Sequence, residues 1–417
     1  MHLRLTAFTV LALTVCAVVA INPQSSPGGP TVIKASGKPI RPHDSIVTLM
    51  AVSTEGRQLA YAGEGDAVVR LWSLPQGNAL RKLSGHKGGV RSLAFTPDGR
   101  LLAVASGDNT VLVWSVSDGR RVATLTGHTA EVKAVYVTPD GRYVLTAAHD
   151  DQRVGWSVLD GKNELSTWSL PDGKLVKTSP VPAELSSCLG NDSSCAVMTP
   201  DGLMFAVGGV RVQEPDLCPI VLFSLPDLQQ VATLASGSTG ALAVTPDGAT
   251  LVAASARGIT LWSIADHRVL RRVDGTGVAV QAVATDGQTL VAAEGGGGLR
   301  AWNLSDLRQT GVMSGHTRTI KALAISPDGR WVASGSDDST TRLWSLPDGL
   351  PVAVFEGQGG EVRHVRFTPD GSALITAEDA TMQIIARANA GIELRYAGGY
   401  VVLWSVNPPA FRRYLGK

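Results

Sequence analysis

The stretch "LWSLPDG", Leu343–Gly349, determines how this chain is interpreted, because close copies of it occur throughout the sequence. A catalytic motif normally occurs once, whereas a repeated phrase indicates a repeated structural unit. The copies are "LWSLPQG" from Leu71, "TWSLPDG" from Thr167, "LFSLPD" from Leu222, "LWSI" from Leu261 and "LWSV" from Leu403.

A second phrase, "ISPDG" at Ile325–Gly329, marks the units more sharply. Its glycine recurs eight times, mostly about 42 residues apart, at Gly56, Gly99, Gly141, Gly202, Gly248, Gly287, Gly329 and Gly371. Proline presets φ and glycine tolerates positive φ, so Pro-Asp-Gly predicts a tight turn. Alternating β-rich segments flank each turn. The pattern therefore predicts four short strands per unit and no helix.

These features resemble those of WD40-repeat β-propellers, which share the period, a Gly-His pair before the first strand and a tryptophan ending the third. The resemblance covers residue 31 to the C-terminus. It implies an all-β fold, a single closed propeller of four-stranded blades that we label a to d. We expect eight blades. Seven would result if the first unit or the unit around Gly287 were merged or displaced.

The family also implies a hydrogen-bonded set of His, Ser or Thr, Trp and Asp within a blade. The aspartate that usually follows the tryptophan is here serine in seven units and Asn303 in the eighth. Because the sets recur with the repeat, we interpret them as structural and not as hydrolase triads. The expected sets are His316, Ser334, Trp344 and Asp338; His128, Thr146, Trp168 and Asp150; and the partial pairs His86–Asp108 and His43–Asp66.

Register suggests how the ring closes. Thr31–Ile40 lies where an outer strand d should be, so we expect it to complete the last blade. A competing strand is Ala410–Gly416. Closure would remove sheet edges that otherwise invite aggregation.

Three units carry extra residues, which is where a repeat scaffold places function. Met382–Ala397 predicts a hairpin that lengthens strands b and c, and Gly209–Val221 predicts a shorter one. In the third unit, either the b–c hairpin extends through Trp156 or a later d–a loop is long. We favour the first, because "GKLVKTSP" then forms strand d. All three insertions are expected on one face, where b–c and d–a connections emerge.

The N-terminal stretch differs from the rest. An apolar run, Leu5–Ala20, follows Arg4, with small residues at the cleavage positions, which predicts a signal peptide over residues 1–20. Residues 21–30 predict a flexible linker and residues 31–417 the propeller domain. We expect a secreted or periplasmic protein without an integral membrane domain after cleavage. An uncleaved signal would instead anchor the chain.

Composition excludes one class of partner. The chain has 37 basic and 36 acidic residues and no basic run, so nucleic-acid binding is not expected. Of the four cysteines, Cys16 belongs to the signal. In an exported protein, a Cys188–Cys218 disulfide would clamp an insertion, Cys188–Cys195 is the rival, and an unpaired trio is the alternative. The four repeat histidines have no metal-ligand spacing, so neither metal nor cofactor is expected.

The function that follows is a non-enzymatic scaffold outside the cytoplasm that binds a protein or peptide on the insertion face. The residues we expect to contact the partner are Trp156, Arg387, Arg395 and Tyr396, because aromatic and arginine side chains dominate interfaces. Trp156 could instead pack on its own blade. The alternative function is an exported propeller enzyme of lactonase, lyase or quinone-dependent oxidoreductase type. Its central-channel site would lie near His364, the one residue that stands out in strand a.

Overall fold

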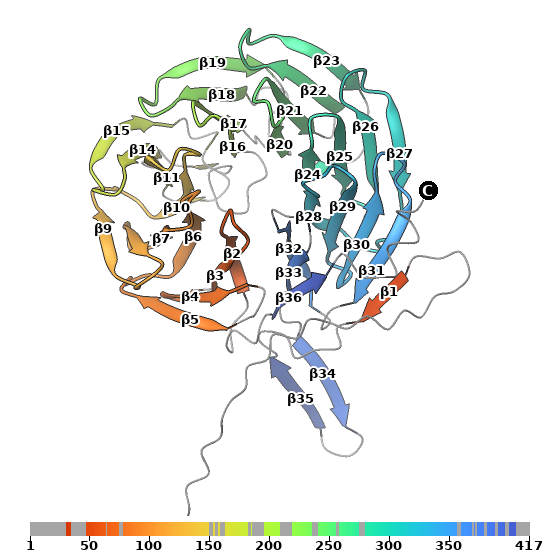
Figure 1. Cartoon of the computed structure of the whole chain (residues 1–417), viewed down its shortest axis with the longest axis horizontal. Coiled ribbons are helices and arrows are strands. Elements are labelled where there is room, and N and C mark those ends of the chain that lie inside the picture. Colours follow the sequence, from red (N-terminus) through yellow and green to blue (C-terminus); the bar gives the residue numbers. More distant parts are fainter. Residues whose placement is uncertain are drawn as a thin grey trace, which may run out of the picture.

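The computed structural model describes residues 31–34 and 47–405, with gaps at 64, 75–77, 150–152, 155–156, 159–162, 182–184, 186–195, 209–218, 236–240, 256–257, 275–279, 357–359, 369–370, 372, 379–381, 388–390 and 397–399. All of its described elements are strands. They form eight radial antiparallel sheets arranged as a ring (Figure 1), which confirms the predicted all-β propeller with eight blades.

Each blade runs from an inner strand a to an outer strand d, in chain order. The first four blades are β2 (Val47–Val52), β3 (Gln58–Gly63), β4 (Val68–Ser73) and β5 (Ala79–Ser84); β6 (Val90–Phe95), β7 (Leu101–Ser106), β8 (Val111–Ser115) and β9 (Arg121–Leu125); β10 (Val132–Val137), β11 (Tyr143–Ala148), β14 (Glu164–Ser169) and β15 (Leu175–Pro180); and β16 (Ala196–Met198), β17 (Met204–Gly208), β18 (Pro219–Ser224) and β19 (Gln230–Ala235).

The other four follow the same order, and the eighth has three described strands. They are β20 (Ala241–Val244), β21 (Thr250–Ser255), β22 (Gly258–Ser263) and β23 (Val269–Asp274); β24 (Val280–Thr285), β25 (Thr289–Glu294), β26 (Leu299–Asn303) and β27 (Gln309–Met313); β28 (Ile320–Ile325), β29 (Trp331–Ser336), β30 (Thr340–Ser345) and β31 (Pro351–Glu356); and β32 (Val362–Phe367), β33 (Ala373–Glu378) and β36 (Tyr400–Ser405).

The expectation for ring closure was wrong. The segment β1 (Thr31–Lys34) does not complete the last blade but pairs in parallel with β31, with Thr31 opposite Ala353. It is thus a fifth, outermost strand of blade 7. An outer strand exposes unpaired backbone groups along its free edge. The outer edge of blade 7 can therefore pair with an extended segment as well as the outer edge of blade 8 can. The competing strand, Ala410–Gly416, lies outside the described residues.

The a–b turns explain why "TPDG" recurs. In blade 2, the Thr96 hydroxyl donates to Asp98 Oδ1 over 2.6 Å and accepts from the Leu101 amide over 3.0 Å. The same aspartate oxygen accepts from the Arg100 amide, and the Gly99 amide donates to the Thr96 carbonyl. Gly99 has φ of 67°, which glycine adopts without strain. The motif therefore satisfies its own polar groups at each strand reversal.

Strand b is buried and mostly apolar because each blade is covered on both faces. In β7, Leu102 and Val104 pack towards blade 1, whereas Ala103 and Ala105 pack towards blade 3. This split follows from the two-residue period of a strand. Outer strands such as β5 are mostly exposed.

The tryptophan of "LWS" joins neighbouring blades. Trp114 packs into the cluster between blades 1 and 2, and Trp344 into that between blades 6 and 7. Eight such clusters connect successive blades, and the last places Ile375 of blade 8 against Tyr61 and Trp72 of blade 1. The repeated phrase is therefore an inter-blade packing device, as the sequence predicted.

Candidate interaction surface

Connections b–c and d–a lie at one end of every blade, since strands in a blade alternate in direction. Two b–c insertions are described as hairpins here. In blade 3, β12 (Arg153–Val154) pairs with β13 (Ser157–Val158), and β14 then supplies strand c with Trp168. This confirms that the b–c hairpin is the extended part and that β15 is strand d.

The second hairpin consists of β34 (Met382–Arg387) and β35 (Gly391–Tyr396), with Met382 opposite Tyr396. It forms a separate two-stranded sheet. The expectation that this hairpin lengthens strands b and c, which are β33 and β36, was therefore wrong. Figure 1 shows it projecting beyond the outline of the ring. A short hairpin with its own strand pairing exposes both faces unless a further surface covers it.

The expected contact residues fall on these insertions. Arg387 ends β34, and Arg395 and Tyr396 end β35, so the three belong to one hairpin. Trp156 lies outside the described residues, between β12 and β13. The Gly209–Val221 insertion is described only from Pro219, where β18 begins. Cys188, Cys195 and Cys218 also lie outside the described part of the chain.

Sequence reasoning missed a charged rim at the same end of the blades, formed where the inner strands begin. Lys133 Nζ lies 2.6 Å from Glu131 Oε2, and Arg91 approaches the same carboxylate at 3.4 Å. In blade 7, Lys321 lies 3.4 Å from Asp337.

Blades 6 and 8 add to this rim. Arg300 Nε lies 2.9 Å from Glu294 Oε1, and Arg363 lies 3.2 Å from Glu361. One signal could have found most of it, because a basic residue occupies the second position of strand a in four units: Arg91, Lys133, Lys321 and Arg363. Exposed ion pairs of this kind add little to folding stability. The fold does not require them, so these charges can serve to contact a partner.

The His, Ser, Trp and Asp set of blade 7 forms one continuous chain. Trp344 Nε1, which can only donate, lies 2.9 Å from Ser334 Oγ. The Ser334 hydroxyl then donates to His316 Nε2 over 2.8 Å, and His316 Nδ1 donates to Asp338 Oδ2 over 2.8 Å. Because the Asp338 carboxylate can only accept, His316 Nδ1 carries a proton. In that tautomer Nε2 accepts from the Ser334 hydroxyl, whose oxygen also accepts from the indole.

Blades 3 and 2 carry shorter versions. His128 Nε2 lies 2.9 Å from Thr146 Oγ1, which also accepts from Trp168 Nε1 over 3.0 Å. Asp150 lies outside the described residues. In blade 2, His86 Nδ1 lies 3.2 Å from Asp108 Oδ2, but Val104 occupies the position of Ser334 and offers no hydroxyl.

Blade 1 keeps the tryptophan donor but has a different acceptor. Trp72 Nε1 donates to the Tyr61 hydroxyl over 3.0 Å, and Tyr61 stands in the register position of Ser334. Asp66 lies 2.7 Å from Arg70 Nη1. Its expected partner His43 lies outside the described residues.

Burial and hydrogen bonding together determine the ionisation of these groups. It lowers the pKa of His128 to about 4, because the charged imidazolium would lose its hydration. For Asp108, burial opposes ionisation, but hydrogen bonds from Thr110, the Lys87 amide and His86 outweigh it and lower the pKa to about 2. Similar bonds from His316 and Thr340 hold the pKa of Asp338 well below its ordinary value despite burial.

The hydrogen-bonded set of blade 7 has the residue types of a hydrolase triad, but a substrate could not reach it. The Ser334 side chain is fully buried in strand b, and the His316 side chain is fully buried as well. Since a nucleophile must reach a substrate, this hydroxyl serves the fold. Among the described residues, no group of three or more His, Cys, Asp or Glu side chains is placed to hold a metal ion.

The chain was compared with known proteins. The WD domain, G-beta repeat family matches residues 77–115, 119–154, 307–345 and 349–385. The chain therefore carries WD40 repeats at these four places. A curated relative, the periodic tryptophan protein 2 homolog of Neurospora crassa, is 42% identical over 57 residues. That match covers 14% of this chain and 6% of the relative, so it concerns the repeat and not the whole protein.

A solved structure supports the fold. The computationally designed Ika8 protein superposes with a TM-score of 0.65 at 20% identity, over 89% of this chain and all of that one. At this identity the likeness concerns the fold alone. No helix among the described residues is long and apolar enough to cross a membrane. WD40 propellers generally bind protein partners, so the surfaces of this propeller are the candidate binding sites.

Proposed function

We propose that this WD40-repeat propeller is a protein-interaction scaffold that works outside the cytoplasm and binds a protein or peptide through the face carrying the b–c insertions. The observation that carries the proposal is the β34–β35 hairpin, which belongs to no blade and projects from the ring. An extra element with its own strand pairing adds nothing to the repeat core. Its two arginines and one tyrosine are residue types enriched in interface hot spots.

The charged rim supports the same face. Each of its cations lies against a carboxylate, for example Lys133 beside Glu131 and Lys321 beside Asp337. Paired charges held in place steer a complementary partner and set its orientation more than they add affinity. The hairpin would supply the anchors and the rim would supply the orientation.

Export rests on the N-terminal pattern of Arg4 followed by the apolar run Leu5–Ala20. Mass spectrometry of the purified natural protein tests it, and we expect a mature chain beginning at Ile21. A chain that retains residues 1–20 in a membrane fraction would instead indicate an anchor.

The partner face is tested by crosslinking and co-purification with two matched variants. One variant replaces Trp156, Arg387, Arg395 and Tyr396 with alanine. The control replaces four exposed residues of the opposite a–b turns, Arg57, Arg100, Arg142 and Leu203. We expect a specific partner that the first variant loses and the control retains. Loss in the control alone would place the partner on the other face.

A further inference from the structure

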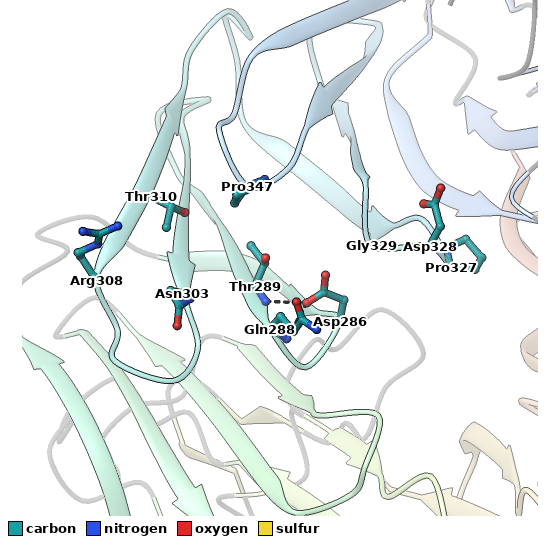
Figure 2. A pocket seen from close by; sticks show the side chains of 10 residues that line it. All are labelled: Asp286, Gln288, Thr289, Asn303, Arg308, Thr310, Pro327, Asp328, Gly329 and Pro347. Atoms are coloured by element: carbon teal, nitrogen blue, oxygen red, sulfur yellow. Dashed lines mark hydrogen bonds between the residues drawn. The ribbon is translucent and has the colours of Figure 1, made fainter. Parts of the chain in front are cut away.

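A pocket of about 460 Å³ lies between blades 6 and 7, at the a–b and c–d end of the blades. This end is opposite to the insertion face, because strand direction alternates within a blade. Figure 2 shows the blade 6 side chains Asp286, Gln288, Asn303 and Thr310 on one side, and Pro327, Asp328 and Pro347 of blade 7 around the other. Its volume lies within the usual range of ligand sites, about 300 to 1,000 Å³.

At five other blade junctions this position is filled by a repeated contact, whereas Gly99, at the junction of blades 1 and 2, lies against Ser53. The proline of one a–b turn packs against the turn glycine of the next blade, as Pro97 Cδ lies 3.5 Å from the Cβ position of Gly141. The same contact recurs at Gly202, Gly248, Gly287 and Gly371.

Blade 6 lacks this proline, because its turn reads "ATDG" from Ala284. Asp286 takes its place, and its Oδ2 atom lies 2.7 Å from the Cβ position of Gly329. A carboxylate therefore replaces an apolar ring at the junction of blades 6 and 7.

Two more departures from the repeat meet at the same pocket. Asn303 stands where the other seven units have serine. Thr310 stands where the other described d strands carry leucine or valine, namely Leu80, Val122, Val176, Val231, Leu270 and Val352. The Thr310 hydroxyl oxygen is buried without a hydrogen-bond partner among the described residues. Burying an unpaired hydroxyl is costly, so three changes in one unit point to a ligand and not to packing.

Opposite charges lie at the two ends of the pocket. Asp286 Oδ1 accepts from the amides of Gln288 and Thr289, over 2.8 and 2.6 Å, and Asp328 Oδ1 accepts from Ser326 Oγ over 2.6 Å. The second oxygen of each carboxylate has no hydrogen bond within the described part of the chain. Asp286 lies against Gly329, the neighbour of Asp328, so both carboxylates occupy one end, whereas Arg308 lies at the other (Figure 2).

We propose that this pocket binds a peptide segment of a partner protein and that an arginine or lysine of that segment contacts Asp286 and Asp328. Charge-assisted bonds to the two free carboxylate oxygens would select a cation. The amides of Asn303 and Gln288 would pair with peptide groups beside it. This site lies away from the insertion face and does not depend on the function proposed above.

The test uses random seven-residue peptides displayed on phage, selected on the full chain. The pocket variant is Asp286→Asn with Asp328→Asn, in which the retained amide oxygens can still accept the turn hydrogen bonds. The matched control is Asp247→Asn, which alters the equivalent turn carboxylate in blade 5. A second pocket variant, Thr310→Val with Asn303→Ser, restores the residues of the repeat and should fold like the other blades.

We expect selected peptides to share arginine or lysine at one position and to bind the first pocket variant at least about tenfold more weakly, with unchanged binding to Asp247→Asn. Restoring the repeat residues should also weaken binding. Peptides without a shared basic residue, no enrichment, or equal binding to the pocket variants would overturn the proposal. Equal affinity for free L-arginine would also overturn it, since the ligand would then be a small molecule.

Discussion

Ser334 links two ring nitrogens, Trp344 Nε1 and His316 Nε2, which have no other side-chain hydrogen bond within the described residues. Its oxygen accepts from the Trp344 indole and its hydroxyl donates to His316, which in turn bonds Asp338. Each buried polar group is satisfied only while the hydroxyl is present. The chain therefore ties strand b, strand c and the Gly-His segment of blade 7 into one unit.

Replacing Ser334 with alanine should destabilise the protein by about 2 to 4 kcal/mol. The change leaves the Trp344 N–H and His316 Nε2 buried and unpaired, and each orphaned group costs about 1 to 3 kcal/mol. Chemical denaturation measures the loss. The control is Ser345→Ala at the exposed end of strand c, which should change the free energy of unfolding much less. Equal losses would show that the hydroxyl has no special role.

His128 makes stability depend on pH. Its folded pKa of about 4 lies below the unfolded value of 6.5, so the unfolded state binds more protons between these limits. Its contribution is complete above pH 6.5 and is lost as pH falls to about 4, by up to about 3 kcal/mol. The free energies of unfolding measured at pH 7 and at pH 4.5 should therefore differ less in His128→Gln than in the parent protein. An unchanged pH dependence in that variant would contradict this origin.

At the scale of elements, the b–c hairpins are additions to a regular frame. The strands of β34 and β35 pair with each other and belong to no blade sheet. By contrast, β33 pairs directly with β36, from Ala373–Ser405 to Glu378–Tyr400, so blade 8 keeps its b–c ladder without the hairpin.

Replacing residues 382–396 with a short glycine-rich turn should leave the ring intact. We expect the thermal midpoint to change by no more than about 2 °C, because no blade ladder is removed, while partner binding is lost. Differential scanning calorimetry measures the first and co-purification the second. A large fall in the midpoint would mean that the hairpin is part of the core.

Strand positions could be predicted from the sequence because each depends on local chemistry. Pro-Asp-Gly fixes a–b turns, and the tryptophan fixes strand c, even in blade 3, where Trp168 belongs to β14. The pairing of Thr31–Lys34 with β31 was not predictable, because any open outer edge can accept an extended segment. The charged rim and the pocket between blades 6 and 7 depend on residues from different units, which a single sequence does not bring together.

At the scale of the whole molecule, packing continues from blade to blade. Clusters join every successive pair, and the one around Tyr61, Trp72 and Ile375 joins blade 8 to blade 1. Such a frame holds its two end faces in fixed relation to each other. The insertion face and the pocket between blades 6 and 7 therefore lie on opposite sides of one rigid scaffold and could hold two partners at once.

The most direct test of the scaffold account is site-specific photocrosslinking with a light-activated amino acid at Tyr396 or at Leu203. The first position lies on the insertion hairpin, and the second is an exposed apolar residue, 59% accessible, in an a–b turn of the opposite face. In the natural host, we predict a discrete protein adduct from position 396, whose yield falls when unlabelled propeller is added, and no such adduct from position 203. An adduct from position 203 and none from 396 would contradict the account.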